Sequence, residues 1–252
     1  MRCMFKDNIP LVELVLRILT GKPDLVIIDC QTQKDMKRLA GARSICLDAY
    51  GEDSSGKKYD IEIQREDRGA EPQRARYHSS VMDVENLDAG QKFSELPDTY
   101  TIFITEKDFY GMGKPVYSIE RTIRETGKAF EDGAHILYVN GEYRGDSDIG
   151  RLMHDFNCTN AGEMNFELMA ERTRYLKENP EGVSQMCKVI EEMRREEREA
   201  GMKEGLKEGL REGMKTAALR MLEAGKYALE DIAGISGLSL DEVKKLQAGQ
   251  GM

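Results

Sequence analysis

The chain has no apolar run of the roughly 18 residues that a membrane-spanning helix requires. The apolar stretch near its start, from Leu11 to Leu19, is interrupted by Glu13 and Arg17, and no small-residue cleavage site follows it. A secretory signal peptide has an unbroken apolar segment before such a site, so this stretch is not typical of one. We therefore expect a cytoplasmic protein that has no membrane partner.

Cysteine and histidine are scarce and scattered. The chain has 5 cysteines, an odd number, and 3 histidines, and none stands in the paired spacing of a zinc site. Such widely separated cysteines also form no disulfide framework, so the reduced thiols of a cytosolic protein are the simplest interpretation. The sequence indicates neither structural zinc nor a disulfide-stapled fold.

Positive charge is also in short supply. Lys and Arg number 37 against 46 Asp and Glu, which gives a formal net charge of -9. Because non-specific affinity for nucleic acid comes mainly from neutralising phosphates, such a chain would bind DNA only through a local basic patch. The best local cluster consists of four arginines diluted by acids: Arg65, Arg68, Arg74 and Arg76.

Composition is consistent with one substantial core and a charge-dense helical appendage, since 40% of the residues are hydrophobic and 33% are charged. The residue patterns divide the chain into four parts. These are a core over 1–160, a helical extension over 161–200, a glycine-period charged helix or linker over 201–216, and a small helical unit over 217–252.

Runs rich in β-branched and aromatic residues predict the strands of the core. They lie at 24–30, 100–106, 115–121 and 134–140, with a strand hairpin over 44–67 between the first and the second. Helical patterns cover 9–20 and 71–88, and a polar helix or loop is predicted from residue 31 to about Gly41. Strands mixed with helices in this order indicate an α/β fold with a mixed sheet.

The hairpin, 44-SICLDAYGEDSSGKKYDIEIQRED-67, carries the most informative polar residues. Its middle is rich in Asp, Ser and Gly, which favours a tight turn that returns Asp48 to the side of Glu62. Side chains two apart on a strand share a face, so Glu62 and Gln64 point the same way while the isoleucines between them face the core. Two carboxylates and a carboxamide are therefore predicted to converge on one patch.

Paired carboxylates repel each other unless one of them binds a proton or a cation fills the gap. Oxygen ligands with no His or Cys nearby suit Mg²⁺ or Mn²⁺ rather than zinc. A dication held in this way lowers the pKa of a bound water and neutralises charge on a phosphodiester. The alternative is a half-exposed hairpin whose polar residues simply face water.

The hairpin opens a longer collinear pattern. LD, a turn and IEIQ are followed by a helix that begins RARYHSS, by 96-LPDTYTIFITEKDFYGMGKPVYSIER-121, by 135-HILYVNGEYRGDSDIGRLMHDFNCT-159 and by a Gly-rich charged helix. This pattern resembles the PD-(D/E)XK nuclease superfamily, and within it the recombination-promoting nuclease and transposase family. The resemblance implies a restriction-endonuclease-like mixed sheet flanked by helices. It also implies a metal-dependent DNA endonuclease that hydrolyses phosphodiester bonds in transposition or recombination.

The resemblance assigns roles to the hairpin residues. Asp48 and Glu62 would bind Mg²⁺ or Mn²⁺, assisted by the backbone carbonyl of Ile63. Gln64 would occupy the place usually held by a lysine, where a carboxamide can orient a water but lacks the positive charge. The residues expected to contact DNA phosphates are Arg65, Arg74 and Arg76.

Glu13, on the first predicted helix, is a further candidate acid, because this superfamily often places one there. An ion pair with Arg17, one turn along the same helix, is the alternative that we favour. His78, on the helix after the hairpin, is not a preferred catalytic base, because a single histidine on such a helix is more often part of the core or the surface.

The activity itself has two rivals. An acidic chain with glutamine at position 64 also fits a catalytically weak or inactive nuclease fold that acts as a DNA-binding or self-associating scaffold. An RNA substrate is the other alternative, because metal-assisted phosphodiester hydrolysis alone does not select the sugar.

From Gly201 a four-residue unit repeats as GMKE, GLKE, GLRE and GMKT, which places apolar residues in a slowly winding stripe on a helix. Each glycine costs about 1 kcal/mol relative to alanine, so such a helix needs a partner or is a flexible linker. We expect a homo-oligomer formed through this helix.

The residues beyond the repeat resemble a helix-turn-helix, with a capping box at Ser239 and Glu242. The second helix opens with two acids, which favours packing or dimerisation over DNA reading.

Overall fold

The computed structural model describes residues 2–36, 45–64 and 69–249. The chain forms two compact units, Met1–Cys187 and Lys188–Met252. Arg65 and Arg68 of the predicted basic cluster lie outside the described residues. Within the described ranges, no helix combines the length and the apolar character that a bilayer crossing requires.

A mixed sheet forms the centre of the first unit, as the sequence predicts. Its strands run in the order β1-β2-β3-β4-β6-β5. The first three pair antiparallel, β3, β4 and β6 run parallel, and β5 returns antiparallel beside β6. The strand bounds are β1 Ile27–Met36, β2 Ile45–Asp53, β3 Lys58–Gln64, β4 Thr99–Thr105, β5 Val116–Ile119 and β6 Ala134–Asn140.

The first strand is longer than its sequence predicts. Residues 31–36, expected to form a polar helix or loop, continue β1 and pair with β2 as far as Met36 opposite Ile45. The prediction is wrong here because β1 stands at an edge of the sheet, where polar side chains can face water while the backbone still pairs.

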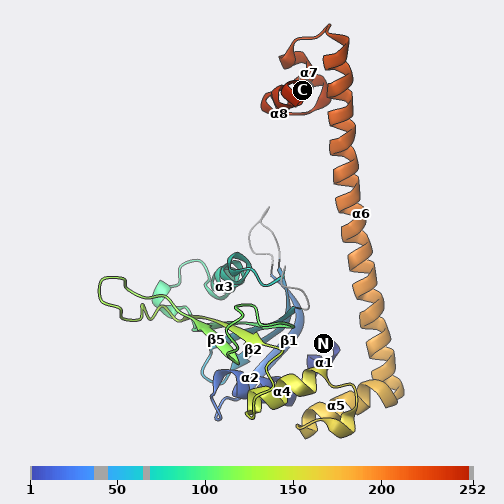
Figure 1. Cartoon of the computed structure of the whole chain (residues 1–252). Helices are drawn as coiled ribbons and strands as arrows, with labels where there is room; N and C mark the ends of the chain where they lie inside the picture. Colours follow the sequence, from blue (N-terminus) through green and yellow to red (C-terminus); the bar gives the residue numbers. More distant parts are fainter. Residues whose placement is uncertain (1, 37–44, 65–68, 250–252) are drawn as a thin grey trace. The chain divides into compact units, whose positions relative to one another are not determined.

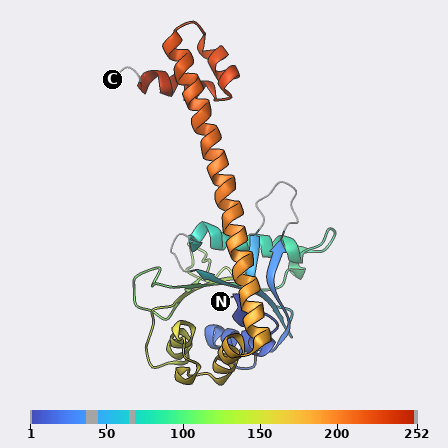
Figure 2. The same ribbon diagram turned by 90° about the vertical axis from the view of Figure 1, so that its right-hand side faces the viewer.

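Helices cover both faces of the sheet (Figures 1 and 2). On one side lies α3, whereas α2, α4 and α5 gather on the other with the short α1. The bounds are α1 Arg2–Phe5, α2 Ile9–Thr20, α3 Pro72–Asn86, α4 Asp148–Asn157 and α5 Glu167–Glu178. Asn8 caps the start of α2 and Gly21, with φ +67°, ends it, so the helix predicted over 9–20 is confirmed.

Alternation along the strands sorts the core into two faces. Ile61, which pairs with Ile102, belongs to the cluster beneath α2. Its neighbour Glu62 pairs with Phe103, which packs with Tyr138 in a separate cluster on the α3 side. The side chain of Glu62 therefore enters the sheet face that α3 covers.

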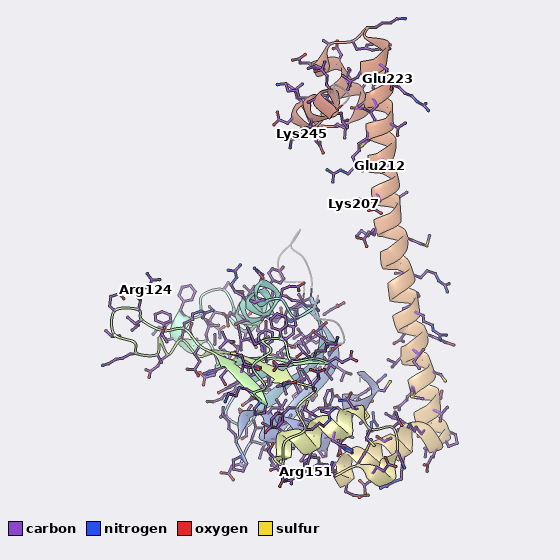
Figure 3. The ribbon with its side chains drawn as sticks, viewed as in Figure 1. Arg124, Arg151, Lys207, Glu212, Glu223 and Lys245 are labelled. Atoms are coloured by element: carbon purple, nitrogen blue, oxygen red, sulfur yellow. The ribbon has the colours of Figure 1, made fainter. Side chains whose placement is uncertain are left out.

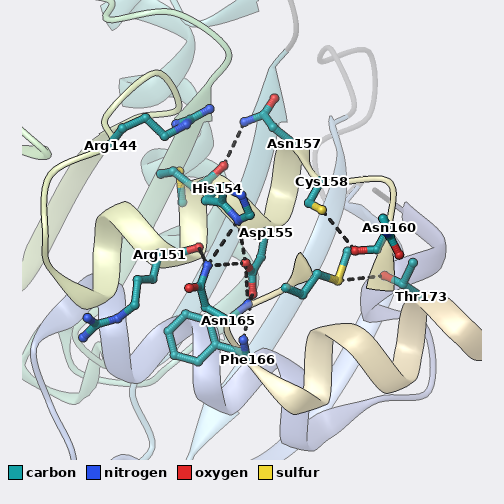
Figure 4. A network of polar contacts seen from close by, with 12 residues as sticks. Arg144, Arg151, His154, Asp155, Asn157, Cys158, Asn160, Asn165, Phe166 and Thr173 are labelled. Carbon is teal, nitrogen blue, oxygen red and sulfur yellow. Dashed lines mark hydrogen bonds and ion pairs between the residues drawn. The ribbon is translucent and has the colours of Figure 1, made fainter. Parts of the chain in front are cut away.

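A buried carboxylate ties α4 to α5 on the opposite side (Figure 4). Asp155 is 1% exposed and accepts hydrogen bonds from the backbone N–H groups of Asn165 and Phe166, each at 2.8 Å. The side-chain amide of Asn165 donates a further bond at 2.8 Å, and His154 Nδ1 lies 3.0 Å away. These partners compensate the burial of a charged group and fix the start of α5.

The second unit consists of most of α6 with two short helices. α6 spans Pro180–Ala224 and includes residues 201–216, and it is followed by α7 Leu229–Ser236 and α8 Leu240–Gly249. Ala218, Ile232 and Val243 form a small buried cluster between the three. Figure 3 shows the side chains of Lys207 and Glu212 projecting from α6.

The predicted capping box is present at the start of α8. The Ser239 N–H donates to Glu242 Oε2 at 3.0 Å, and the Glu242 N–H donates to Ser239 Oγ at 3.3 Å. Gly237, at φ +77°, ends the helix before it. The helix, turn and helix pattern is therefore confirmed.

Candidate active site

The two strands of the hairpin bring the predicted residues together. β2 and β3 pair antiparallel with Ala49 opposite Ile61, so Asp48 and Glu62 occupy the next positions of the two strands. Asp53 stabilises the turn between them by accepting the N–H groups of Ser55 at 2.8 Å and Lys57 at 3.0 Å. The tight polar turn predicted from the sequence is confirmed.

Asp48 and Glu62 each accept a backbone hydrogen bond from the opposite strand. The Asp48 N–H donates to Glu62 Oε1 at 3.0 Å, and the Ile63 N–H donates to Asp48 Oδ2 at 3.1 Å. Gln64 Nε2 donates to Glu62 Oε2 at 3.3 Å. The carboxyl groups of Asp48 and Glu62 are therefore both bonded to backbone where β2 and β3 run side by side, and Gln64 shares the face of Glu62, as the alternation of β3 predicts.

Two residues that the sequence analysis did not select complete the cluster. Asp60 lies two positions before Glu62 on the same face of β3, and His78 reaches it from α3. His78 Nδ1 is 3.0 Å from Asp60 Oδ2, and both residues are buried, as is Glu62. One ligand atom from each of Asp60, Glu62 and His78 lies within 4.8 Å of the other two.

Arg74, one turn before His78 on α3, brings a positive charge to these acids. Its Nη2 lies 3.5 Å from Glu62 Oε2, and its Nε donates to His78 Nε2 at 3.4 Å. The side chain of Arg74 is 41% exposed, whereas that of Glu62 is 2% exposed. Arg74 thus links the buried acids to the protein surface.

Burial dominates the electrostatics of the cluster. It raises the pKa of Glu62 to about 9, with smaller contributions from the neighbouring charges of Asp60 and Asp48 and an opposing one from His78. Burial likewise raises the pKa of Asp60 well above its usual range, against the lowering effects of a hydrogen bond with Glu62 and of the charge of Arg74. Two buried carboxyl groups in this position require a proton or a cation.

The residues also fit a dication. Asp60 Oδ1 is buried, and no donor among the described residues bonds to it, so one lone-pair site in the cluster is open to a cation. Carboxylate oxygens with a carboxamide suit Mg²⁺ or Mn²⁺.

The comparison with protein families agrees with this geometry. The sequence profile described as PD-(D/E)XK nuclease family transposase matches residues 6–143, which is more than half of the 252-residue chain. The chain belongs to this family. No curated protein and no solved structure matches it. The family resemblance predicted from the sequence is confirmed, and with it the mixed sheet flanked by helices.

Glu13 lies away from the cluster, on α2. Its Oε1 is 2.7 Å from Arg17 Nη2, and its Oε2 accepts the N–H of Ile27 at 2.9 Å. α2 packs on the sheet face that carries Ile61, opposite the face of Glu62. The ion pair that we favoured from the sequence is the arrangement observed.

The predicted phosphate-binding arginines have different environments. Arg74 contacts Glu62 and His78, whereas Arg76 is exposed on the same helix, and Arg65 lies outside the described residues. The sequence places all three just beyond the Glu-x-Gln motif. Only the structure shows that Arg74 turns toward that motif.

Proposed function

We propose that this chain is a metal-dependent DNA endonuclease of the cytoplasm that hydrolyses phosphodiester bonds in transposition or recombination. The observation that carries the proposal is that the Asp48 and Glu62 carboxyl groups each bond to the backbone of the other strand where β2 and β3 pair, inside the region matched by the nuclease family. Membership of the family supports a nuclease, and the choice of DNA follows from its description as a transposase.

Asp48 and Glu62, with the backbone carbonyl of Ile63, would hold Mg²⁺ or Mn²⁺. Mg²⁺ is commonly bound by only one or two carboxylates together with water and substrate oxygens, so this set is sufficient. When bound, the dication would supply a water of lowered pKa and would neutralise charge on the phosphodiester.

The chain's own residues would orient the reactants. The carboxamide of Gln64, which already donates to Glu62, can hold a water by a further hydrogen bond. Burial of Glu62 keeps bulk water away from that carboxylate, which strengthens every charge interaction around it. Contacts to DNA phosphates would come from Arg65, Arg74 and Arg76.

Isothermal calorimetry with MnCl₂ separates this proposal from the scaffold alternative. We expect the wild-type chain to bind Mn²⁺, and Asp48→Asn to weaken binding by about tenfold or more, because the substitution removes a charged ligand. Asp29→Asn changes an exposed acid of β1 and is the matched control, with unchanged affinity. A wild-type chain that binds no Mn²⁺ would favour the scaffold.

We also propose that the second unit forms a homo-oligomer through α6. Met202, Leu206 and Leu210 are 70%, 76% and 61% exposed along one stripe of the helix. A Cβ atom added at any of the repeated glycines 201, 205, 209 and 213 would meet no atom of the described chain within 4 Å. A second copy of the chain fits this surface, because basic and acidic residues also repeat along α6 and can pair between copies.

Light scattering after size exclusion tests the oligomer. We expect the wild-type chain to elute above the mass of 28.5 kDa for one copy, and the double variant Leu206→Glu, Leu210→Glu to elute at that mass. Both leucines are exposed, so the substitution leaves the unit itself folded. Glu95→Gln, which changes an exposed acid of the first unit, is the control and stays oligomeric. A monomeric wild type at micromolar concentration would contradict the proposal.

A further inference from the structure

We infer that Arg74 of α3 supplies the positive charge that Gln64 lacks beside Glu62, and that Asp60 and His78 are positioning residues that hold Arg74 there. The inference rests on the proposed function and identifies the group that meets a substrate phosphate.

Arg74 and Gln64 approach the same oxygen. Gln64 Nε2 lies 3.3 Å from Glu62 Oε2, and Arg74 Nη2 lies 3.5 Å from that atom. The carboxamide of Gln64 is neutral, so among the residues that the structure describes Arg74 is the one that brings a permanent positive charge to Glu62. A lysine at position 64 would both donate a hydrogen bond and carry a positive charge. Here Gln64 of β3 donates the hydrogen bond and Arg74 of α3 carries the charge.

Arg74 is held in place by a chain of hydrogen bonds. Its Nε donates to His78 Nε2 at 3.4 Å, which assigns the proton of the neutral ring to Nδ1. That nitrogen then donates to Asp60 Oδ2 at 3.0 Å. Asp60 is fully buried and His78 is 1% exposed, so the imidazole presents its acceptor to Arg74 in a fixed orientation.

Packing limits the movement of the imidazole further. The ring of His78 lies beside the ring of Phe103, with centroids 5.6 Å apart. Both Asp60 and Phe103 project from the sheet face that α3 covers, so the sheet holds the imidazole of His78 in place. The imidazole in turn orients the guanidinium of Arg74.

The guanidinium remains accessible. The side chain of Arg74 is 41% exposed even though Glu62 beside it is buried. Arginine has five N–H donors, so the bonds to Glu62 and His78 leave donors for a phosphate oxygen. Arg74 can therefore contact a substrate phosphate and stabilise the charge of Glu62 at the same time.

A charge-swap experiment tests the role of Arg74. The two test variants are Arg74→Gln alone and Arg74→Gln combined with Gln64→Lys. The two control variants are Arg76→Gln alone and Arg76→Gln combined with Gln64→Lys, because Arg76 is an exposed arginine of the same helix. Affinity is measured by fluorescence anisotropy of a labelled DNA duplex in CaCl₂, and cleavage on plasmid DNA in MgCl₂.

We expect Arg74→Gln to weaken duplex binding by about tenfold and to slow cleavage by about a hundredfold. The substitution removes the positive charge that would contact the DNA phosphate and that lies beside Glu62. Adding Gln64→Lys should return both to within about threefold of the wild type, because the charge is restored beside Glu62. Arg76→Gln should weaken binding slightly, and Gln64→Lys should not correct it.

Two results would overturn the inference: no recovery in the Arg74→Gln, Gln64→Lys variant when its thermal unfolding matches the wild type, or equal recovery on the Arg76→Gln background. Failure of the proposed function looks different. A wild type that binds DNA without cutting it refutes the endonuclease, while the binding data still decide the role of Arg74. A wild type that neither binds nor cuts overturns both.

The positioning role has its own test. In His78→Asn the amide can still donate to Asp60 but is too short to accept from Arg74, whereas His78→Gln restores an acceptor near the position of Nε2. We expect His78→Asn to slow cleavage and His78→Gln to recover most of the rate. On the Arg74→Gln background, His78→Asn should have no additional effect. Additive losses would show that His78 acts independently of Arg74.

Discussion

Replacing Asp48 or Glu62 by alanine is expected to abolish Mg²⁺-dependent cleavage of plasmid DNA, with a loss of at least about 1,000-fold in rate. The two carboxyl groups lie on paired positions of β2 and β3, so either substitution removes a charged ligand from the proposed metal site. The measurement is the rate of conversion of supercoiled plasmid to nicked and linear forms in MgCl₂.

The control is Asp29→Ala, an exposed acid on β1 that should cut at the wild-type rate. Circular dichroism and thermal unfolding show whether each variant folds, and Asp48→Asn provides a near-isosteric second variant. Wild-type rates in both Asp48→Ala and Glu62→Ala would refute the assignment of these residues.

The second large effect is on stability against pH. The pKa of Glu62 is raised to about 9 in the folded chain from 4.5, chiefly by burial. Between these values the folded state holds a proton that the unfolded state has released, so the free energy of unfolding falls as pH rises. The contribution of Glu62 to the free energy of unfolding is greatest below about pH 4.5 and is lost by about pH 9.

We expect the melting temperature of the metal-free first unit to fall by at least about 5 °C between pH 5 and pH 9. Glu62→Gln should remove most of this fall, because a carboxamide cannot ionise. Burial raises the pKa of Asp60 in the same direction, so some dependence remains in the variant.

Saturating MnCl₂ should also flatten the wild-type profile, since a bound dication stabilises the ionised carboxylate. Calorimetric scans of the wild type and Glu62→Gln at both pH values decide the matter. An equal pH dependence in the two proteins would contradict the buried, protonated state of Glu62.

Much of the hairpin could be predicted from sequence because its signals are local. Strand alternation fixed which side chains share a face, and the Asp and Gly residues of the turn fixed the reversal. Together they placed Asp48 beside Glu62 and Gln64, as observed. The capping box of Ser239 and Glu242 was predictable for the same reason.

The other half of the cluster depends on which face of α3 meets the sheet. Asp60 carried a usable signal, since it lies two residues before Glu62 and must share its face. His78 carried a weaker signal, since helical spacing places it on one face with Ala75 and Met82, which are buried. Arg74 was selected for its charge alone, because the sequence does not show that it turns toward β3. Their contacts arise when α3 packs over Phe103 and Tyr138, which is a tertiary effect.

The most direct measurement of the central claim is cleavage of supercoiled plasmid by the purified wild-type chain, with MgCl₂ or MnCl₂ and with excess EDTA. The account predicts nicked and linear products with either dication and none with EDTA. Intact plasmid under all conditions, from a folded chain that binds DNA, would contradict the claim that Asp48 and Glu62 form a metal-dependent nuclease site.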